Sequence, residues 1–292
     1  MIGEKKRYWE LDFVRGLCVL LMIFDHAMFS FADVLPGIWE MFNVKFFGGL
    51  PDLALDYWTW NFRQVFRIFV FTAFFVLCGI SCTFSRSNLK RGIKAFLVAT
   101  AITYVTATID SLMDMGLIIR FGVIHMLAVS MIIYGLIDLV GALIEKIKKN
   151  AVTLWIRRLL PGVAGLILFI LYLVLWGGIS FGGEYIGFYC DVKVGGENPL
   201  GSLLYVLMEV EGAEFYSSDY FPLLPYGAIV LFGSIIGWLI YHTRAKNYLV
   251  RHEKKCFAPI CFLGRNALWV YVLHQVVIVA VLFIIGFFVS LF

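Results

Sequence analysis

The sequence predicts an all-α integral membrane protein, a polytopic helix bundle with about seven transmembrane helices. The chain of 292 residues is 61% hydrophobic and only 15% charged, and its mean hydropathy is +0.88, which is more apolar than a soluble domain requires. Apolar segments long enough to cross about 30 Å of hydrocarbon follow one another along the whole chain. No long hydrophilic region separates them, so we expect residues 1–292 to form a single integral membrane domain.

Seven segments approach the roughly 20 apolar residues that a membrane-spanning helix needs. The basic N-terminal residues are not followed by a short apolar core with a small-residue cleavage site, so the first segment is expected to be a retained helix. We expect the spans at about residues 11–33, 62–84, 94–113, 117–144, 158–177, 222–242 and 265–290.

The charges in the connecting loops predict the orientation of the helices. Lys and Arg gather before the first span and after the second, fourth and sixth spans, which places all four groups on one side. The loops at about 34–61 and 178–221 are rich in Asp and Glu, with Lys45 and Lys193 as their only basic residues. By the positive-inside rule the N-terminus is cytoplasmic, the C-terminus is extracytoplasmic, and these two larger loops are extracytoplasmic. The net charge of +4 is modest and gives no reason to expect nucleic-acid binding.

The first span contains Asp12, Arg15, Asp25 and His26, and ionisable groups at membrane depth are costly enough that they usually mark a pathway or a site. Arg15 and His26 are eleven residues apart, so on a helix both project from one face about 16 Å apart along the axis. An imidazole titrates near neutrality, so His26 beside Asp25 is suited to taking a proton from a weak nucleophile and returning it. A histidine that only hydrogen-bonds a neighbouring helix is the alternative.

Other ionisable residues fall at a similar depth. His125 and Arg120 lie near the extracytoplasmic end of the fourth span. Some of these residues could be structural ion pairs, for example Arg67 with Asp110. His274 in the last span either lines the same cavity or hydrogen-bonds between helices. No cysteine pair has metal-ligand spacing, and we expect no metal.

Polar and basic residues at the cytoplasmic helix ends, around Arg86 to Gly92 and at Gly264 to Asn266, could hold phosphates. The alternative is that they only set the topology.

Five strings along the chain are similar to one known family. They are Glu10–Gly16 continuing to His26, Gly79–Asn88, Phe121–Leu127, Asp219–Pro225, and Phe262–Asn266 continuing to Gln275. In this order they resemble the bacterial heparan-alpha-glucosaminide N-acetyltransferase-like catalytic domain family, a group of transmembrane acyltransferases. The opening string is also similar to the start of the acyltransferase-3 family, whose first-helix histidine is regarded as catalytic.

The resemblance implies a multi-pass enzyme of the bacterial plasma membrane that moves an acetyl or other acyl group from cytoplasmic acetyl-CoA to an extracytoplasmic sugar or glycan. The acceptor would be an amino or hydroxyl group, the enzyme would lie in the lipid bilayer, and a homodimeric state is left open. Carried onto this chain, the resemblance and the depth argument together give three groups of site residues: catalytic His26, Asp25 and His125; donor-binding Arg15, Arg86, Asn88, Arg91, Arg265 and His274; and acceptor-binding Arg120, Arg67 and Asp219.

The chain departs from the family's animal lysosomal members, whose reactive histidine lies in the first lumenal loop, because residues 34–61 contain no histidine. We therefore favour direct attack: His26, oriented by Asp25, deprotonates the acceptor while His125 or Arg120 stabilises the oxyanion. Transient acylation of a histidine is the alternative mechanism. The alternative function is a proton-coupled transporter in which the buried histidines and carboxylates at this depth relay protons. No internal repeat in the sequence supports this alternative.

Overall fold

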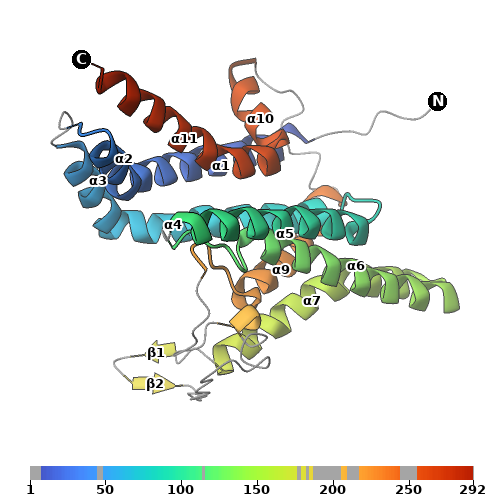
Figure 1. Ribbon diagram of the computed structural model, residues 1–292. Coiled ribbons are helices and arrows are strands. Elements are labelled where there is room, and N and C mark those ends of the chain that lie inside the picture. Colours follow the sequence, from blue (N-terminus) through green and yellow to red (C-terminus); the bar gives the residue numbers. More distant parts are fainter. Residues whose placement is uncertain are drawn as a thin grey trace. The chain divides into compact units, whose positions relative to one another are not determined.

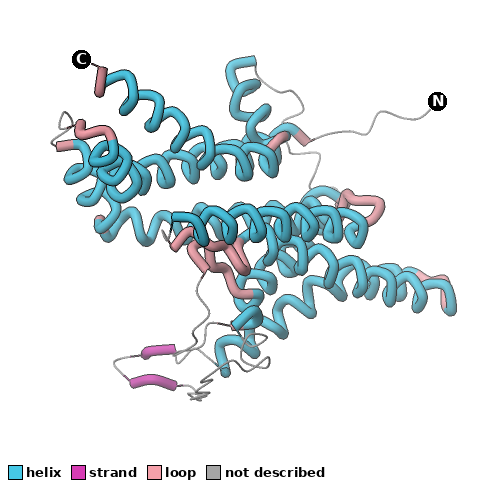
Figure 2. Tube along the Cα trace, in the orientation of Figure 1, coloured by secondary structure: helices cyan, strands magenta, loops and turns pink. Residues whose placement is uncertain are grey.

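The computed structural model describes residues 8–44, 49–113, 116–175, 179–181, 184–186, 205–208, 217–243 and 255–291. Most of these residues lie in α-helices, as Figures 1 and 2 show. Seven helical segments are long and apolar enough to cross a membrane. The prediction of a multi-pass helical membrane protein is therefore confirmed, whereas the orientation of the termini stays a prediction.

The chain divides into two compact units. The first unit contains Met1–Phe74 and Leu249–Phe292, and the second contains Phe75–Tyr248. Helix α4 (Asn61–Cys82) contributes its first part to one unit and its last part to the other. The expectation of a single domain over residues 1–292 stays a prediction.

The first unit is built on helix α1 (Trp9–Phe29), which continues through a π-helical turn, η1 (Ser30–Val34), into α2 (Leu35–Met41). Together they form one segment of 33 residues, longer than the span predicted at 11–33. Pro36 has no N–H and would break a regular α-helical ladder, and the wider π turn lies directly before it. Ser30 begins this turn, and its hydroxyl donates to the carbonyl of His26 at 2.9 Å.

Two C-terminal helices, one short and one long, pack on α1. They are α10 (Ala258–Arg265), preceded by the 3₁₀ turn η3 (Lys255–Phe257), and α11 (Ala267–Val289). The backbones of α1 and α10 touch, because a Cβ placed on Gly16 would lie 1.9 Å from the Ile260 carbonyl oxygen. A Cβ on Gly264 would lie 1.8 Å from the Asp12 carbonyl oxygen. Only glycine fits at this crossing.

The region at about 34–61, predicted as a loop, contains two helices. Helix α2 lies within it, and α3 (Leu50–Thr59) packs against α1 and η1 through the fully buried Ala54. Leu35 and Trp39 of α2 form a small core with Leu282 of α11. The sequence missed both helices because Pro36, Gly37 and Pro51 interrupt the apolar periodicity.

The second unit contains α5 (Asn88–Met113), α6 (Val123–Ile147), α7 (Ala151–Leu175) and α9 (Leu223–Tyr241). Helices α5 and α7 begin earlier than their predicted spans at 94 and 158. Asn150 and Thr153 cap each other across the start of α7, which lets its first turns carry polar residues. The second predicted loop contains an antiparallel pair, β1 (Ile179–Phe181) and β2 (Glu184–Ile186), that the sequence did not predict, and most of its remaining residues lie outside the described ranges.

Candidate active site

His26 on α1 and His274 on α11 form a hydrogen-bonded pair in the first unit. Nδ1 of His26 lies 2.6 Å from Nε2 of His274. The two rings stack with centroids 4.9 Å apart and an interplanar angle of 19°. The Nδ1 of His274 lies 2.6 Å from the carbonyl oxygen of Tyr271. The structure thus shows the hydrogen bond between helices that the sequence left open for His274, whereas its predicted donor-binding role stays a prediction.

A second bridge joins Gln275 of α11 to Ser30 of η1, the turn that follows α1. Gln275 Nε2 donates to Ser30 Oγ at 3.0 Å, and Ser30 donates in turn to the carbonyl of His26. His274 therefore contacts the His26 ring directly, and Gln275 is linked to the His26 backbone through Ser30. The ring and the backbone of His26 are both held by these contacts.

Asp25 binds Arg63 of α4 instead of His26. Two parallel bonds join them, from Arg63 Nε to Oδ1 at 2.7 Å and from its terminal nitrogen to Oδ2 at 2.6 Å. The Tyr57 hydroxyl donates to Oδ1 at 3.1 Å, and the guanidinium lies 3.5 Å from the ring centroid of Trp58. Arg63 is only 6% exposed, so this is a buried, bidentate ion pair. Arg63 is not among the predicted site residues, although a buried carboxylate such as Asp25 needs a cation close to it.

Tyr57 lies outside the membrane-spanning segments, on α3. Burial, with the neighbouring charge of Asp25 and the hydrogen bond to it, raises the pKa of the Tyr57 hydroxyl above its ordinary value. The hydroxyl therefore keeps its proton and acts as a donor to Asp25 at neutral pH.

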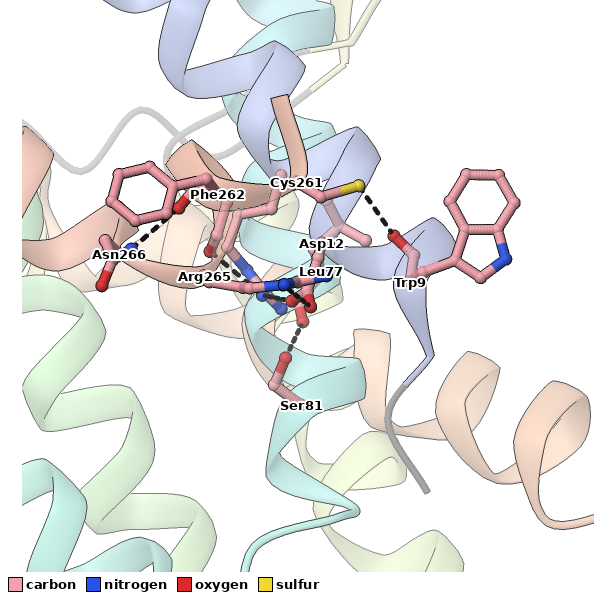
Figure 3. A network of polar contacts seen from close by, with 10 residues as sticks. Trp9, Asp12, Leu77, Ser81, Cys261, Phe262, Arg265 and Asn266 are labelled. Atoms are coloured by element: carbon pink, nitrogen blue, oxygen red, sulfur yellow. Dashed lines mark hydrogen bonds and ion pairs between the residues drawn. The ribbon is translucent and has the colours of Figure 1, made fainter. Parts of the chain in front are cut away.

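A second cluster lies near the start of α1. Asp12 is 4% exposed and accepts from Arg15 at 3.2 Å and from Arg265 Nε at 3.4 Å. Arg15 also donates to the carbonyl of Gly264 at 3.5 Å. Figure 3 shows Asp12 and Arg265 pointing toward one another from α1 and α10. The predicted donor-binding residues Arg15 and Arg265 are thus brought together. Asp12, Arg15 and Arg265 form what we call the Asp12 cluster, and their combined charge is +1.

The predicted residues of the second unit gather at the start of α6. The backbone N–H of Gly122 donates to His125 Nδ1 at 3.4 Å, and His125 Nε2 lies 3.4 Å from Thr103 Oγ1. Asp219 Oδ2 accepts from the backbone N–H of Val123 at 3.2 Å. Both side chains therefore satisfy backbone groups at a helix N-terminus. Their predicted catalytic and acceptor-binding roles stay predictions.

A cleft of about 460 Å³ opens beside this helix start in the second unit. Its lining is mostly aromatic and hydroxylic, and it includes His125 and the predicted acceptor residue Arg120. Other lining residues are Phe96, Thr103, Tyr104 and Phe121. His26 and His125 belong to different units, so their shared site stays a prediction.

The remaining predicted residues have simpler surroundings. Asn88 is 6% exposed and donates to the Cys82 carbonyl at 2.8 Å, which holds the end of α4, while Arg91 donates to Asn88 at 3.4 Å. Arg86 and Arg67 are exposed. Within the described ranges, no three His, Cys, Asp or Glu side chains come together as a group that could hold a metal ion.

Comparison with known proteins bears on this arrangement. A family model described as heparan-alpha-glucosaminide N-acetyltransferase, catalytic, matches residues 7–186 and 167–276. The chain belongs to this family. The resemblance of the five strings is thereby confirmed. No curated protein and no solved structure matches the chain.

Membership of the heparan-alpha-glucosaminide N-acetyltransferase catalytic family makes the protein a membrane acetyltransferase. The matched residues include both histidines of the pair and all three members of the Asp12 cluster. Helix α1 joins the two features, with Arg15 and His26 about 16 Å apart along its axis. An arginine-rich group and a histidine pair thus occupy the two ends of one helix in this acetyltransferase.

Proposed function

We propose that this membrane acetyltransferase transfers the acetyl group of cytoplasmic acetyl-CoA to the amino group of an extracytoplasmic sugar, or to a hydroxyl group of such a sugar. The observation that carries the proposal is the arrangement on α1, where the Asp12 cluster and the His26–His274 pair belong to one helix in one unit. The loop charges support a cytoplasmic N-terminus, and the bacterial plasma membrane is the location that the resemblance implies. This orientation would put the Asp12 cluster at the donor side.

The Asp12 cluster fits the phosphates of coenzyme A. Guanidinium groups bind phosphate oxygens in pairs of parallel hydrogen bonds, and Asp12 holds two of them close together. The combined charge of +1 favours an anion at this place. The gap of about 16 Å from Arg15 to His26 is of the order of an extended pantetheine arm, so a thioester could reach His26 while the phosphates stay with the arginines.

The chemistry assigned to His26 is that of a general base. The acceptor nitrogen attacks the thioester carbonyl carbon, and His26 takes the proton that this nitrogen loses. The C–N bond forms, the C–S bond breaks, and the coenzyme A thiolate leaves and recovers the proton from His26. The products are the N-acetylated sugar and coenzyme A. The predicted oxyanion donor, His125 or Arg120, belongs to the second unit and stays a prediction.

The test uses the full-length protein in lipid nanodiscs with acetyl-CoA and a panel of amino sugars and sugars that offer only hydroxyl groups. We expect release of free coenzyme A together with an acetylated product, measured with a thiol reagent and by mass spectrometry. His26→Ala should lower kcat by about 10²- to 10⁴-fold, the range that general bases supply. His242→Ala is the matched control, because His242 stacks on Phe84 and contacts the Trp238 ring in the other unit.

Full activity of His26→Ala would contradict the assignment of the base. Movement of sugar across proteoliposomes without release of coenzyme A would instead favour the proton-coupled transporter.

A further inference from the structure

We infer that His274 is a positioning residue that fixes the proton of His26 on Nδ1 and leaves Nε2 as the nitrogen that accepts a proton. The catalytic consequence of this inference rests on the proposed acetyl transfer. The tautomers themselves follow from the geometry of the pair. Both tautomers depend on one backbone carbonyl, which can only accept a hydrogen bond.

The Tyr271 carbonyl determines the tautomer of His274. Its oxygen lies 2.6 Å from His274 Nδ1, so this nitrogen must carry a proton and donate it. In the neutral ring the other nitrogen, Nε2, then has no proton and acts as an acceptor. Tyr271 precedes His274 by three residues on α11, so the helix itself supplies this contact.

The tautomer of His274 determines that of His26. Nε2 of His274 is an acceptor, so Nδ1 of His26, 2.6 Å away, must be the donor. In the neutral state Nε2 of His26 is then unprotonated. The chain from the carbonyl to His274 to His26 therefore presents a lone pair at one defined nitrogen.

The other charged and titratable neighbours of His26 are arranged differently. Asp25 precedes His26 in the chain but accepts hydrogen bonds from Arg63 and from the Tyr57 hydroxyl. Arg67 acts on His26 through its positive charge. The hydrogen bond from Gln275 to Ser30 holds α11 against α1 at the same level. Within the described part of the chain, His274 is thus the side chain that hydrogen-bonds the His26 ring.

The pair also explains how a protonated His26 would be stabilised. When Nε2 receives the acceptor's proton, the ring becomes an imidazolium, and its Nδ1–H bond to His274 becomes charge-assisted. Such bonds are stronger than neutral ones, so the contact with His274 strengthens when the acceptor's proton reaches His26. His274 would act on His26 as the third member of a catalytic triad acts on its histidine, although here the partner is neutral.

The direct test is solid-state NMR of the full-length protein labelled with ¹⁵N-histidine in nanodiscs. The chain has five histidines, so the signals can be assigned by single substitutions, with His26→Ala identifying His26. We expect a protonated Nδ1 and an unprotonated Nε2 for His26 at neutral pH. A wild-type His26 with its proton on Nε2 would overturn the inference, whether or not the enzyme is active.

The catalytic consequence is tested with two variants. His274→Leu removes the acceptor, so both tautomers of His26 become populated, and kcat should fall by about 10- to 100-fold, less than loss of the base itself costs. The KM for acetyl-CoA should stay unchanged, which distinguishes the positioning role from the donor-binding role that the sequence predicted for His274. His274→Gln offers a side-chain oxygen to His26 Nδ1 and should recover most of the rate together with the wild-type tautomer. A His274→Gln variant with the wild-type tautomer and the low kcat of His274→Leu would overturn the positioning role.

These readouts separate the two proposals. If His274→Leu does not fold, the wild-type spectrum and His274→Gln still decide. An inactive wild-type protein with the expected tautomer would overturn the proposed function and support the assigned hydrogen bonds.

Discussion

At the scale of single residues, the bidentate pair of Asp25 and Arg63 should be the most sensitive charged contact of the first unit. Substituting Arg63 with Met leaves the Asp25 carboxylate without its cation in a largely buried place, and breaking such a pair costs about 3–5 kcal/mol. We therefore expect a clear drop in the thermal unfolding midpoint in nanodiscs. The double variant Asp25→Asn, Arg63→Gln should recover part of the loss, because neither side chain is then charged.

The matched control is Arg157, which pairs with Asp138 and Glu145 but is 35% exposed. Pairs exposed to this degree contribute about 0–1 kcal/mol, so Arg157→Met should shift the unfolding midpoint little. Equal shifts for Arg63→Met and Arg157→Met would show that burial does not set the energy of these pairs.

The residue scale also shows what the sequence could and could not predict about the site. Arg15 and His26 stand out because an apolar span must have a reason to keep an ionisable group. Their partners could not be predicted: His274 is 248 residues from His26, and only the packing of α11 on α1 brings the rings together. His125, Asn88 and Asp219 belong to recognisable strings, yet each satisfies backbone groups at a helix end, and a side chain that does this has the same sequence signature as one that binds a substrate.

At the scale of elements, the crossing of α1 and α10 determines whether the Asp12 cluster can form. Gly16→Ala puts a Cβ 1.9 Å from a backbone oxygen of Ile260, so the helices must separate. Overpacking typically costs about 1–3 kcal/mol, and separation would also pull Arg265 away from Asp12. We expect a lower unfolding midpoint together with weaker acetyl-CoA binding, measured by isothermal titration calorimetry.

Gly37→Ala is the control for this prediction. Gly37 lies in α2 with no atom within 4 Å of its Cβ position, so alanine there should be neutral or stabilise the protein by about 0.4–1 kcal/mol. Unchanged acetyl-CoA binding in Gly16→Ala would contradict the proposed link between the helix crossing and the donor site.

At the scale of the whole molecule, the seven spans were predictable because about 20 consecutive apolar residues have few other uses. The division into two units was not predictable, since it depends on which helices share contacts and not on apolar length. The helices within the first predicted loop and the strands within the second lie where proline, glycine and polar residues hide the periodicity. The orientation of the helices in the membrane is predicted here from the charges of the loops alone.

The natural cysteines allow the orientation to be measured. Cys256 is exposed and lies in the basic segment predicted to be cytoplasmic, whereas Cys18, Cys82 and Cys261 are buried. Cys190 lies in the loop at about 178–221, predicted to be extracytoplasmic. A membrane-impermeant maleimide should therefore label Cys256 only in inside-out vesicles, and Cys256→Ser should abolish that signal. Labelling of Cys256 in intact cells would reverse the predicted orientation and would place the Asp12 cluster on the side that lacks acetyl-CoA, so this one measurement tests the topology and the proposed donor site together.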